Sequence, residues 1–182
     1  MLLEGKTAVV YGGGGKVGGA VARAYASEGA RVFLAGRTIG TLDEVAEDIA
    51  SAGGVAETAQ FNALDEQAIE KHIGEVVERA GSVDISFNAI SIQDLQLIPL
   101  VGMTREDFMR PISTGTSTHF LTVRAAARRM ATQGSGVILT FSASSVRAFF
   151  PGVYVGASGS RARRSKLSQR SLRLRSGRTA SA

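Results

Sequence analysis

Largely apolar runs alternate with segments of helical periodicity along most of this chain. The apolar runs predict strands, because a strand covered on both faces has no polar side to show. They fall at residues 7–11, 31–35, 55–61, 83–87 and 136–141. Helices are predicted between them at 17–27 and 41–50, after Asp65, and at 120–130, with a short segment at 104–108. This alternation predicts an α/β fold with a doubly wound parallel sheet and helices on both faces.

Helical spacing also predicts which side chains are buried and where helices begin. Thr41 and Asp65 are expected to cap the second and third helices, since Thr and Asp accept bonds from first-turn N–H groups. The faces expected inside are Ala20, Val21, Ala24 and Tyr25 in the first helix, Leu42, Val45, Ala46 and Ile49 in the second, and Ile69, Ile73, Val76 and Val77 in the third.

Charge is distributed unevenly, and this divides the chain. Residues 157–182 hold seven Arg, one Lys and no acidic residue, whereas residues 1–156 hold 13 basic and 16 acidic residues. The net charge of +5 therefore belongs to the tail alone. We expect one domain over 1–156, long enough for a real core, and a basic Arg/Ser-rich tail over 157–182 without ordered structure.

Composition excludes several classes of site. The chain has no Cys, and its two His residues, His72 and His119, have no metal-ligand spacing around them, so no metal site is expected. The first residues do not resemble a secretory signal, and no apolar run approaches the roughly 18–20 residues that span a bilayer. We expect a cytoplasmic protein with no membrane partner.

The glycines after the first strand form the candidate binding site. Gly12, Gly14, Gly15 and Gly18 follow residues 7–11 and open a helix, where backbone N–H groups can approach a phosphate closely. The alternative is a flexible turn without a ligand. A P-loop is not an alternative, because Val10 stands where its first glycine is required and Val17 where its Ser or Thr is required.

Arg37 follows the second strand, where a dinucleotide-binding protein meets the cofactor ribose. A carboxylate there binds the 2′-hydroxyl of NAD, whereas Arg suits the 2′-phosphate of NADP. The residues therefore favour NADP(H) over NAD(H), and Lys16 could add a second positive charge. The alternative is an Arg that is merely solvated at a strand end.

The chain resembles the short-chain dehydrogenase/reductase family, whose NAD(P)-binding domain is a Rossmann fold. That family's T-G-x-x-x-G-x-G corresponds to residues 11–18, with Tyr11 in place of Thr and Lys16 in place of the middle Gly. Asn62-Ala63 resembles the segment beside the adenine, and Asn88-Ala89 resembles the N-N-A-G sequence. The cofactor-binding residues that the resemblance and the glycine pattern imply are Gly12, Gly14, Gly15, Lys16, Val17, Gly18, Arg37, Asn62, Ala63, Asn88 and Ala89.

The resemblance implies hydride transfer between NADP(H) and a small carbonyl or alcohol substrate. Ser142 would bond the substrate oxygen, with Ser144 and Ser145 as competitors, and Tyr154 would exchange the proton. In the family a Lys four residues after the Tyr lowers its pKa, but here Ser158 stands there. The alternative is a protein that binds nucleotide without catalysis. Homo-oligomers are also implied by the resemblance.

The resemblance ends near residue 156, and the fold is expected to be incomplete on its C-terminal side. Three explanations of the tail remain open: a reading-frame error, a degenerate nucleotide-binding protein, or a basic arm. The arm has no aromatic residues among its Arg and Ser, so stacking on bases is not expected and nucleic acid is not the favoured partner.

Overall fold

The computed structural model describes residues 1–92, 98 and 100–141. The chain divides into two units, residues 1–93 with 113–141, and residues 94–112 with 142–182. In the second unit the described residues form a 3-10 turn at Leu100–Gly102 and the start of a helix. The predicted boundary at 156/157 lies outside the described residues and stays a prediction.

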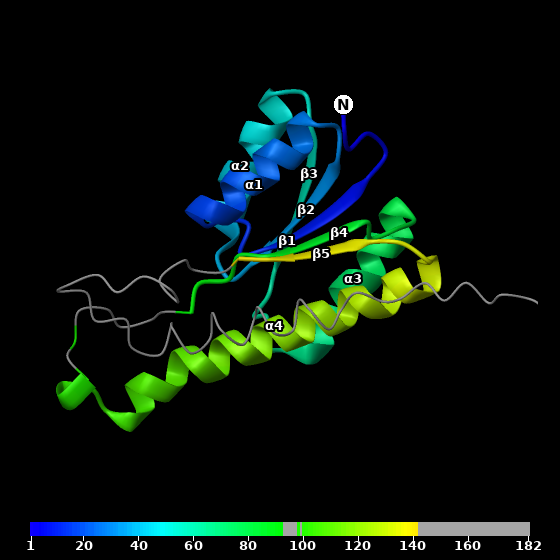
Figure 1. The fold of residues 1–182 in the computed structure, drawn as a ribbon. Coiled ribbons are helices and arrows are strands. Elements are labelled where there is room, and N and C mark those ends of the chain that lie inside the picture. The colour runs from blue at the N-terminus through cyan, green and yellow to red at the C-terminus, as the bar shows by residue number, and fades with distance from the viewer. Residues whose placement is uncertain (93–97, 99, 142–182) are drawn as a thin grey trace, which may run out of the picture. The chain divides into compact units, whose positions relative to one another are not determined.

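The first unit contains a five-stranded parallel sheet (Figure 1). Its strands are β1 (Thr7–Tyr11), β2 (Arg31–Gly36), β3 (Val55–Gln60), β4 (Ile85–Asn88) and β5 (Val137–Thr140), in the spatial order β3-β2-β1-β4-β5. Every residue of β1 and β4 is buried, which explains why both read as apolar runs. The predicted doubly wound α/β fold is confirmed.

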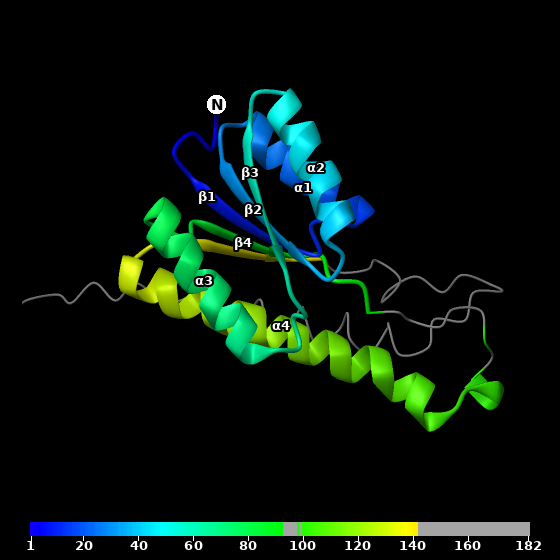
Figure 2. The same cartoon turned by 180° about the vertical axis from the view of Figure 1, so that it is seen from behind.

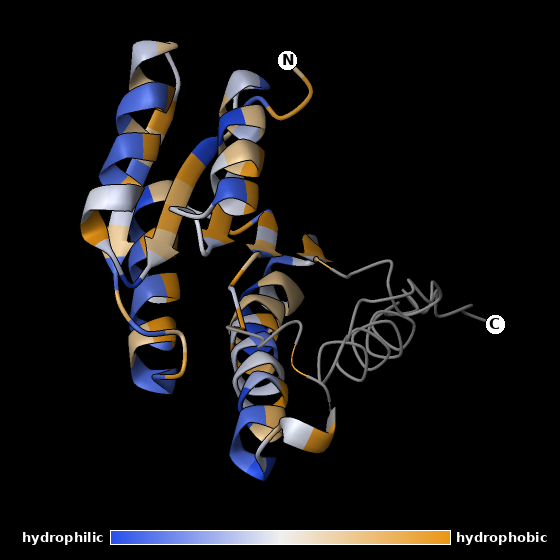
Figure 3. Cartoon of the chain, turned by 90° about the vertical axis from the view of Figure 1, so that its left-hand side faces the viewer, coloured by the Kyte–Doolittle hydropathy of each residue, from blue (hydrophilic) through white to orange (hydrophobic). Residues whose placement is uncertain are grey.

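Helices cover both faces of this sheet (Figures 1 and 2). α1 (Lys16–Ser27) and α2 (Ile39–Ser51) lie on one face, and α3 (Glu66–Ala80) and residues 113–133 of α4 (Arg105–Gln133) lie on the other. Alternate residues of β1 enter two separate cores: Ala8 and Val10 pack with α1 and α2, whereas Val9 and Tyr11 pack with α3 and α4. Figure 3 shows the strands as the apolar centre and the polar stripes of the helices outside.

Of the two predicted helix caps, one is confirmed and one is wrong. The Asp65 carboxylate accepts bonds from the N–H groups of Gln67 and Ala68, at 3.0 and 3.1 Å. The helix α2, however, begins at Ile39. The residue at its N-cap is therefore Thr38, which has an extended backbone and makes no side-chain cap bond. Thr41 lies inside the first turn, and its hydroxyl donates to the Thr38 carbonyl at 3.0 Å.

The buried face of α1 differs from the one predicted. Ala20, Val21, Ala24 and Tyr25 were expected inside, but Ala20 and Ala24 are exposed and Val21 and Tyr25 are only half-buried. The helix passes so close to the glycine loop and the sheet that only its smallest side chains fit between them. The residues that are buried are Gly18, Gly19, Ala22 and Ala26.

The long helix α4 was predicted as two separate segments but is continuous over 29 residues. It runs through Pro111, a residue that usually ends a helix. Residues 113–118 are all Ser, Thr or Gly, so no apolar period marks them as helical. The sequence therefore predicted only the short segment at 104–108 and the segment from 120 to 130, where Ala125, Ala126 and Met130 are buried.

One residue, Asp84, links three strands at the amino end of the sheet through its carboxylate and its backbone carbonyl. Asp84 accepts bonds from the Thr7 N–H at 2.9 Å, the Ser82 hydroxyl at 2.8 Å and the Lys6 ammonium at 3.4 Å. Its own carbonyl accepts from the Val137 N–H at 2.8 Å. Partial burial acts to raise the pKa of Asp84, but the Thr7, Ser82 and Lys6 donors outweigh it and hold that pKa below its usual value.

A buried histidine lies between two aromatic rings under the same sheet. His72 is 5 % exposed and its Nε2 has no hydrogen-bond partner among the described residues. Its ring centroid is 5.2 Å from that of Phe61 and 6.5 Å from that of Phe33. Burial is the largest cause that lowers the pKa of His72 to about 4, while the neighbouring charges partly cancel.

We predict that His72 makes the fold less stable in mild acid. In the unfolded chain His72 has its ordinary pKa of about 6.5, whereas in the folded chain its pKa is about 4. Between these two values the unfolded chain binds a proton that the folded chain does not, so the free energy of unfolding falls as the pH falls from about 6.5 to about 4. Between pH 7 and pH 5 the free energy of unfolding should fall by about 2 kcal/mol through this group. Urea unfolding at both pH values should show that His72→Phe removes most of this fall. An unchanged fall in the variant would contradict the assignment.

Candidate functional site

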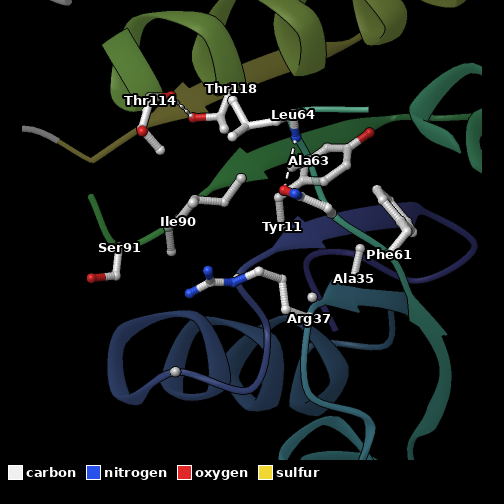
Figure 4. Close-up of a pocket in the computed structure, with 15 residues that line it drawn as sticks. Tyr11, Ala35, Arg37, Phe61, Ala63, Leu64, Ile90, Ser91, Thr114 and Thr118 are labelled. Carbon is white, nitrogen blue, oxygen red and sulfur yellow. Dashed lines mark hydrogen bonds between the residues drawn. The ribbon is translucent and has the colours of Figure 1, made fainter. Parts of the chain in front are cut away.

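A cavity of about 280 Å³ lies where the carboxyl ends of the parallel strands meet (Figure 4). Parallel strands end at one edge of the sheet, so residues far apart in the sequence come together there. In Figure 4 Thr114 and Thr118 of α4 lie on the wall opposite Arg37. The lining residues are Tyr11, Gly12, Gly15, Ala35, Gly36, Arg37, Phe61, Asn62, Ala63, Leu64, Ala89, Ile90, Ser91, Thr114 and Thr118.

Strand order changes direction at this place. β2 and β3 follow β1 on one side, and β4 and β5 lie on its other side. The loops that leave β1 and β4 therefore diverge, which opens a crevice between them. The two strands are joined at its base by the Ala89 N–H, which donates to the Tyr11 carbonyl at 2.9 Å.

The glycine loop fits this crevice only because its residues have no side chains. Gly12 has a φ of +76°, and a Cβ there would lie 2.8 Å from the Ala89 carbonyl oxygen. A Cβ on Gly18 would overlap the carbonyl oxygen of Gly12. A Cβ on Gly14 would overlap the Thr41 side chain of α2. The loop is thus held between β4, α1 and α2 by contacts that only glycine permits.

The start of α1 offers unpaired backbone donors beside this cavity. Its N-cap is Gly15, which has no side chain to bond the first turn, and that turn contains no acidic residue. An α-helix leaves the N–H groups of its first turn without an intrahelical partner, and these are Lys16, Val17 and Gly18. Such a helix end attracts an anion through its dipole and its free donors.

Two free cations stand near the same helix end. Within the described part of the chain, most Lys and Arg side chains make ion pairs. Those without one are Lys16, Arg37, Arg105 and Arg129. Arg37 lines the cavity and Lys16 is the first residue of α1. No carboxylate is among the residues that line the cavity.

A compact turn after β3 forms another wall. The Asn62 side-chain oxygen accepts a bond from the Leu64 N–H at 3.1 Å, and its carbonyl accepts from the Asp65 N–H at 2.8 Å. The Phe61 N–H donates to the Gly36 carbonyl at 2.9 Å, which attaches the turn to β2. Asn62 and the following Ala63 both line the cavity, and their predicted role in cofactor binding stays a prediction.

Asn88 serves the site indirectly. It is 6 % exposed and does not line the cavity. Its amide donates to the Thr122 hydroxyl at 2.9 Å, and its side-chain oxygen accepts from the Ile90 N–H at 3.0 Å. These bonds tie the end of β4 to α4 and shape the Ala89–Ser91 loop, which does line the cavity.

The structure brings together part of the predicted site. Six predicted residues line the cavity, namely Gly12, Gly15, Arg37, Asn62, Ala63 and Ala89. Gly14, Lys16, Val17, Gly18 and Asn88 do not line it but belong to the loop, helix end or strand around it. The predicted catalytic pair, Ser142 and Tyr154, lies outside the described residues.

Several lining residues were not predicted as part of the site. Ile90 and Ser91 continue the predicted loop after β4, so position alone could have indicated them. Thr114 and Thr118 are four residues apart, a spacing that places both on one helix face. Nothing in the sequence marked residues 113–118 as helical, so that signal could not be used.

Within the ranges that the structure describes, no cluster of three or more His, Asp or Glu residues could hold a metal ion. Nor, in the same ranges, does any helix have the length and apolarity required to cross a membrane.

Comparison with known proteins identifies relatives of this arrangement. Residues 6–159 match the family of short chain dehydrogenases. Over 142 residues the chain is 38% identical to the L-rhamnose 1-dehydrogenase (NAD(P)(+)) of Azotobacter vinelandii, an alignment that covers 75% of this chain and 54% of that protein. The chain thus spans about half the length of that curated relative.

Solved structures resemble it over most of its length. A short-chain type dehydrogenase/reductase from Mycobacterium marinum aligns with a TM-score of 0.85 at 28% identity, covering 93% of this chain and 68% of that one. A metagenomic short-chain oxidoreductase in complex with NADP aligns with a TM-score of 0.78 at 27% identity, covering 94% and 76% of the two chains.

We predict that Gly18→Ala destabilises the fold by about 1–3 kcal/mol, because its Cβ overlaps the Gly12 carbonyl, which cannot move without displacing the loop. The matched control is Gly74→Ala in α3, where an added Cβ meets no atom within 4 Å. That change should stabilise the protein by about 0.5–1 kcal/mol through helix propensity. Urea unfolding of the two variants measures both effects. If Gly18→Ala and Gly74→Ala changed the free energy of unfolding equally, the glycine loop would not be close-packed against α1.

Proposed function

This chain belongs to the short-chain dehydrogenase family, and from that membership we propose that it is an oxidoreductase acting with NADP(H) on a small carbonyl or alcohol substrate. The observation that carries the proposal is the cavity at the switch point of the sheet, with a side-chain-free glycine loop on one wall and an unpaired arginine at its edge. A dinucleotide carries a pyrophosphate, and a phosphate is the group that such a loop can approach most closely.

Described residues are available for the pyrophosphate and the adenosine of that cofactor. The free N–H groups of Lys16, Val17 and Gly18 would hold the pyrophosphate, and Asn62 and Ala63 would contact the adenine. The bound cofactor would supply or accept the hydride. Thr114, Thr118 and Ser91 surround the opposite side of the cavity with hydroxyl groups. That wall would orient the remaining half of the cofactor.

Charge supports a preference for NADP(H). Arg37 follows β2, lines the cavity and makes no ion pair with any described residue, so its guanidinium is available to a phosphate. A carboxylate at this place would repel the 2′-phosphate, and none is found among the described residues that line the cavity. The relative from A. vinelandii is described as using NAD(P)(+), and the metagenomic neighbour was solved with NADP.

Family resemblance assigns the proton chemistry to two residues. The Ser142 hydroxyl would donate a hydrogen bond to the substrate oxygen, and the Tyr154 hydroxyl would give or take the proton there. With Ser158 four residues after Tyr154, no ammonium group at that position stabilises the phenolate. We therefore expect slow turnover at neutral pH that accelerates as the pH rises.

Cofactor preference tests the role of Arg37. Arg37→Ala should weaken NADPH binding by about tenfold or more through loss of a charge-assisted contact, and should leave NADH binding nearly unchanged. Calorimetric titration of both nucleotides measures the ratio. Arg129→Ala is the matched control, since this exposed Arg also lacks an ion pair but does not line the cavity. Equal losses for NADPH and NADH would refute the 2′-phosphate role.

Turnover tests the catalytic assignment separately. Consumption of NADPH, followed by absorbance with a panel of small aldehydes and ketones, should be lost in Tyr154→Phe while NADPH affinity stays within about twofold. The substitution removes only the hydroxyl, which is the proton donor, and changes none of the residues that line the described cavity. A protein that binds NADPH but consumes none, in wild type as in the variant, would be a nucleotide binder without catalysis.

A further inference from the structure

A row of aromatic rings runs from the cavity into the core between the sheet and α3. Tyr11, at the end of β1, meets Phe61 edge to face with ring centroids 6.4 Å apart. Phe61 lies 5.2 Å from His72, and His72 lies 6.5 Å from Phe33 of β2, again edge to face. We call these four residues the aromatic row. Its first two members line the cavity and the other two do not.

The row supports a wall that has few other attachments. The bonds within the turn, from Leu64 N–H to Asn62 and from Asp65 N–H to Asn62, hold its own shape. Its backbone link to the sheet is the bond from Phe61 N–H to the Gly36 carbonyl. Phe61 and Ala63 are the turn residues that pack against the core under α3. Packing of the Phe61 ring therefore contributes to the position of the turn over the cavity.

Tyr11 takes part in this packing through its ring. The residue is 1 % exposed, and its hydroxyl has no hydrogen-bond partner among the described residues. Burial and, to a smaller extent, the charge of Glu70 raise its pKa, so the phenol stays neutral. Figure 4 shows the ring beside Ala63, with the hydroxyl on the side away from Arg37.

His72 lies behind Phe61 as a second support. The Phe61 ring thus contacts two other rings, that of Tyr11 edge to face and that of His72 at a tilt. Such ring pairs are favourable in protein cores, and two of them oppose displacement of the Phe61 ring. His72 is in α3, the helix that Asp65 caps directly after the turn. The turn is thus in contact with β1 through Tyr11 and with α3 through His72.

We propose that Tyr11 and His72 are positioning residues, which hold the turn at 61–64 through Phe61 and so set the affinity of the cavity for the adenosine half of a dinucleotide. The inference rests on the proposed function. The turn stands beside Gly36 and Arg37, at the end of the cavity assigned to adenosine. The ring contacts of the row do not include Ser91, Thr114 or Thr118 of the hydroxyl-lined wall. Binding of the other half of the dinucleotide should therefore depend less on the row than binding of the adenosine half.

Adenosine 2′,5′-bisphosphate is the probe, because it carries only the adenosine end of NADP. Tyr11→Leu and His72→Leu should each weaken its binding by about three- to tenfold, which is the range expected for loss of one aromatic pair. Tyr11→Phe and His72→Phe keep the rings and should bind within about twofold of wild type. Calorimetric titration on the full chain measures all five proteins.

Ile73→Val is the matched control for mere destabilisation. Ile73 is fully buried in the same core but is not in the row, so its truncation should lower the melting temperature without changing affinity for the probe. If Tyr11→Leu fails to fold by circular dichroism, Phe61→Leu carries the same expectation from a half-buried position.

The outcomes separate the inference from the function on which it rests. A wild-type chain that does not bind the bisphosphate would overturn the proposed cofactor and this inference with it. A wild type that binds, with folded Tyr11→Leu, His72→Leu or Phe61→Leu binding equally well, would overturn the inference alone. Equal weakening in Ile73→Val would also overturn it, since stability would then account for the loss.

Discussion

The structure depends on a place where two pieces of backbone pass too close for any side chain to lie between them. Gly12 turns out of β1 against the Ala89 carbonyl, and Gly18 of α1 lies against the Gly12 carbonyl. Glycine at these positions lets α1 begin immediately above the end of β1. The free N–H groups of the helix are thereby brought to the cavity at the switch point of the sheet. The shape of the glycine wall of the cavity and the place of the helix end both follow from this steric condition.

Polar groups around this contact divide into those that are satisfied and those that are free. Asn88 and Asp84 have their hydrogen-bonding capacity used within the fold, at opposite ends of β4. Most described Lys and Arg side chains are likewise paired with carboxylates, whereas Arg37 at the cavity is not. A cation left free beside unpaired helix donors, with no carboxylate among the described residues that line the cavity, is the arrangement expected of an anion site.

The sequence predicted what depends on local pattern and missed what depends on packing in three dimensions. β1 and β4 were evident because their full burial demands apolar residues, and the Asp65 cap because its bonds reach only two and three residues ahead. The course of α4 through Pro111 was missed because residues 113–118 have no apolar period. Glycines and Arg37 could be located by chain order alone. The contact between Tyr11 and Phe61, fifty residues apart in sequence, could not.

The most direct test is to follow backbone amide resonances of the full chain while NADP⁺ is titrated. We expect shifts concentrated in residues 12–18, 36–37, 61–64 and 89–91, the segments that form the cavity and the helix end. The amide of Gly74, in the middle of α3, should stay unmoved. Shifts centred elsewhere, or none at saturating NADP⁺ in a folded protein, would contradict the assignment of this cavity as the nucleotide site.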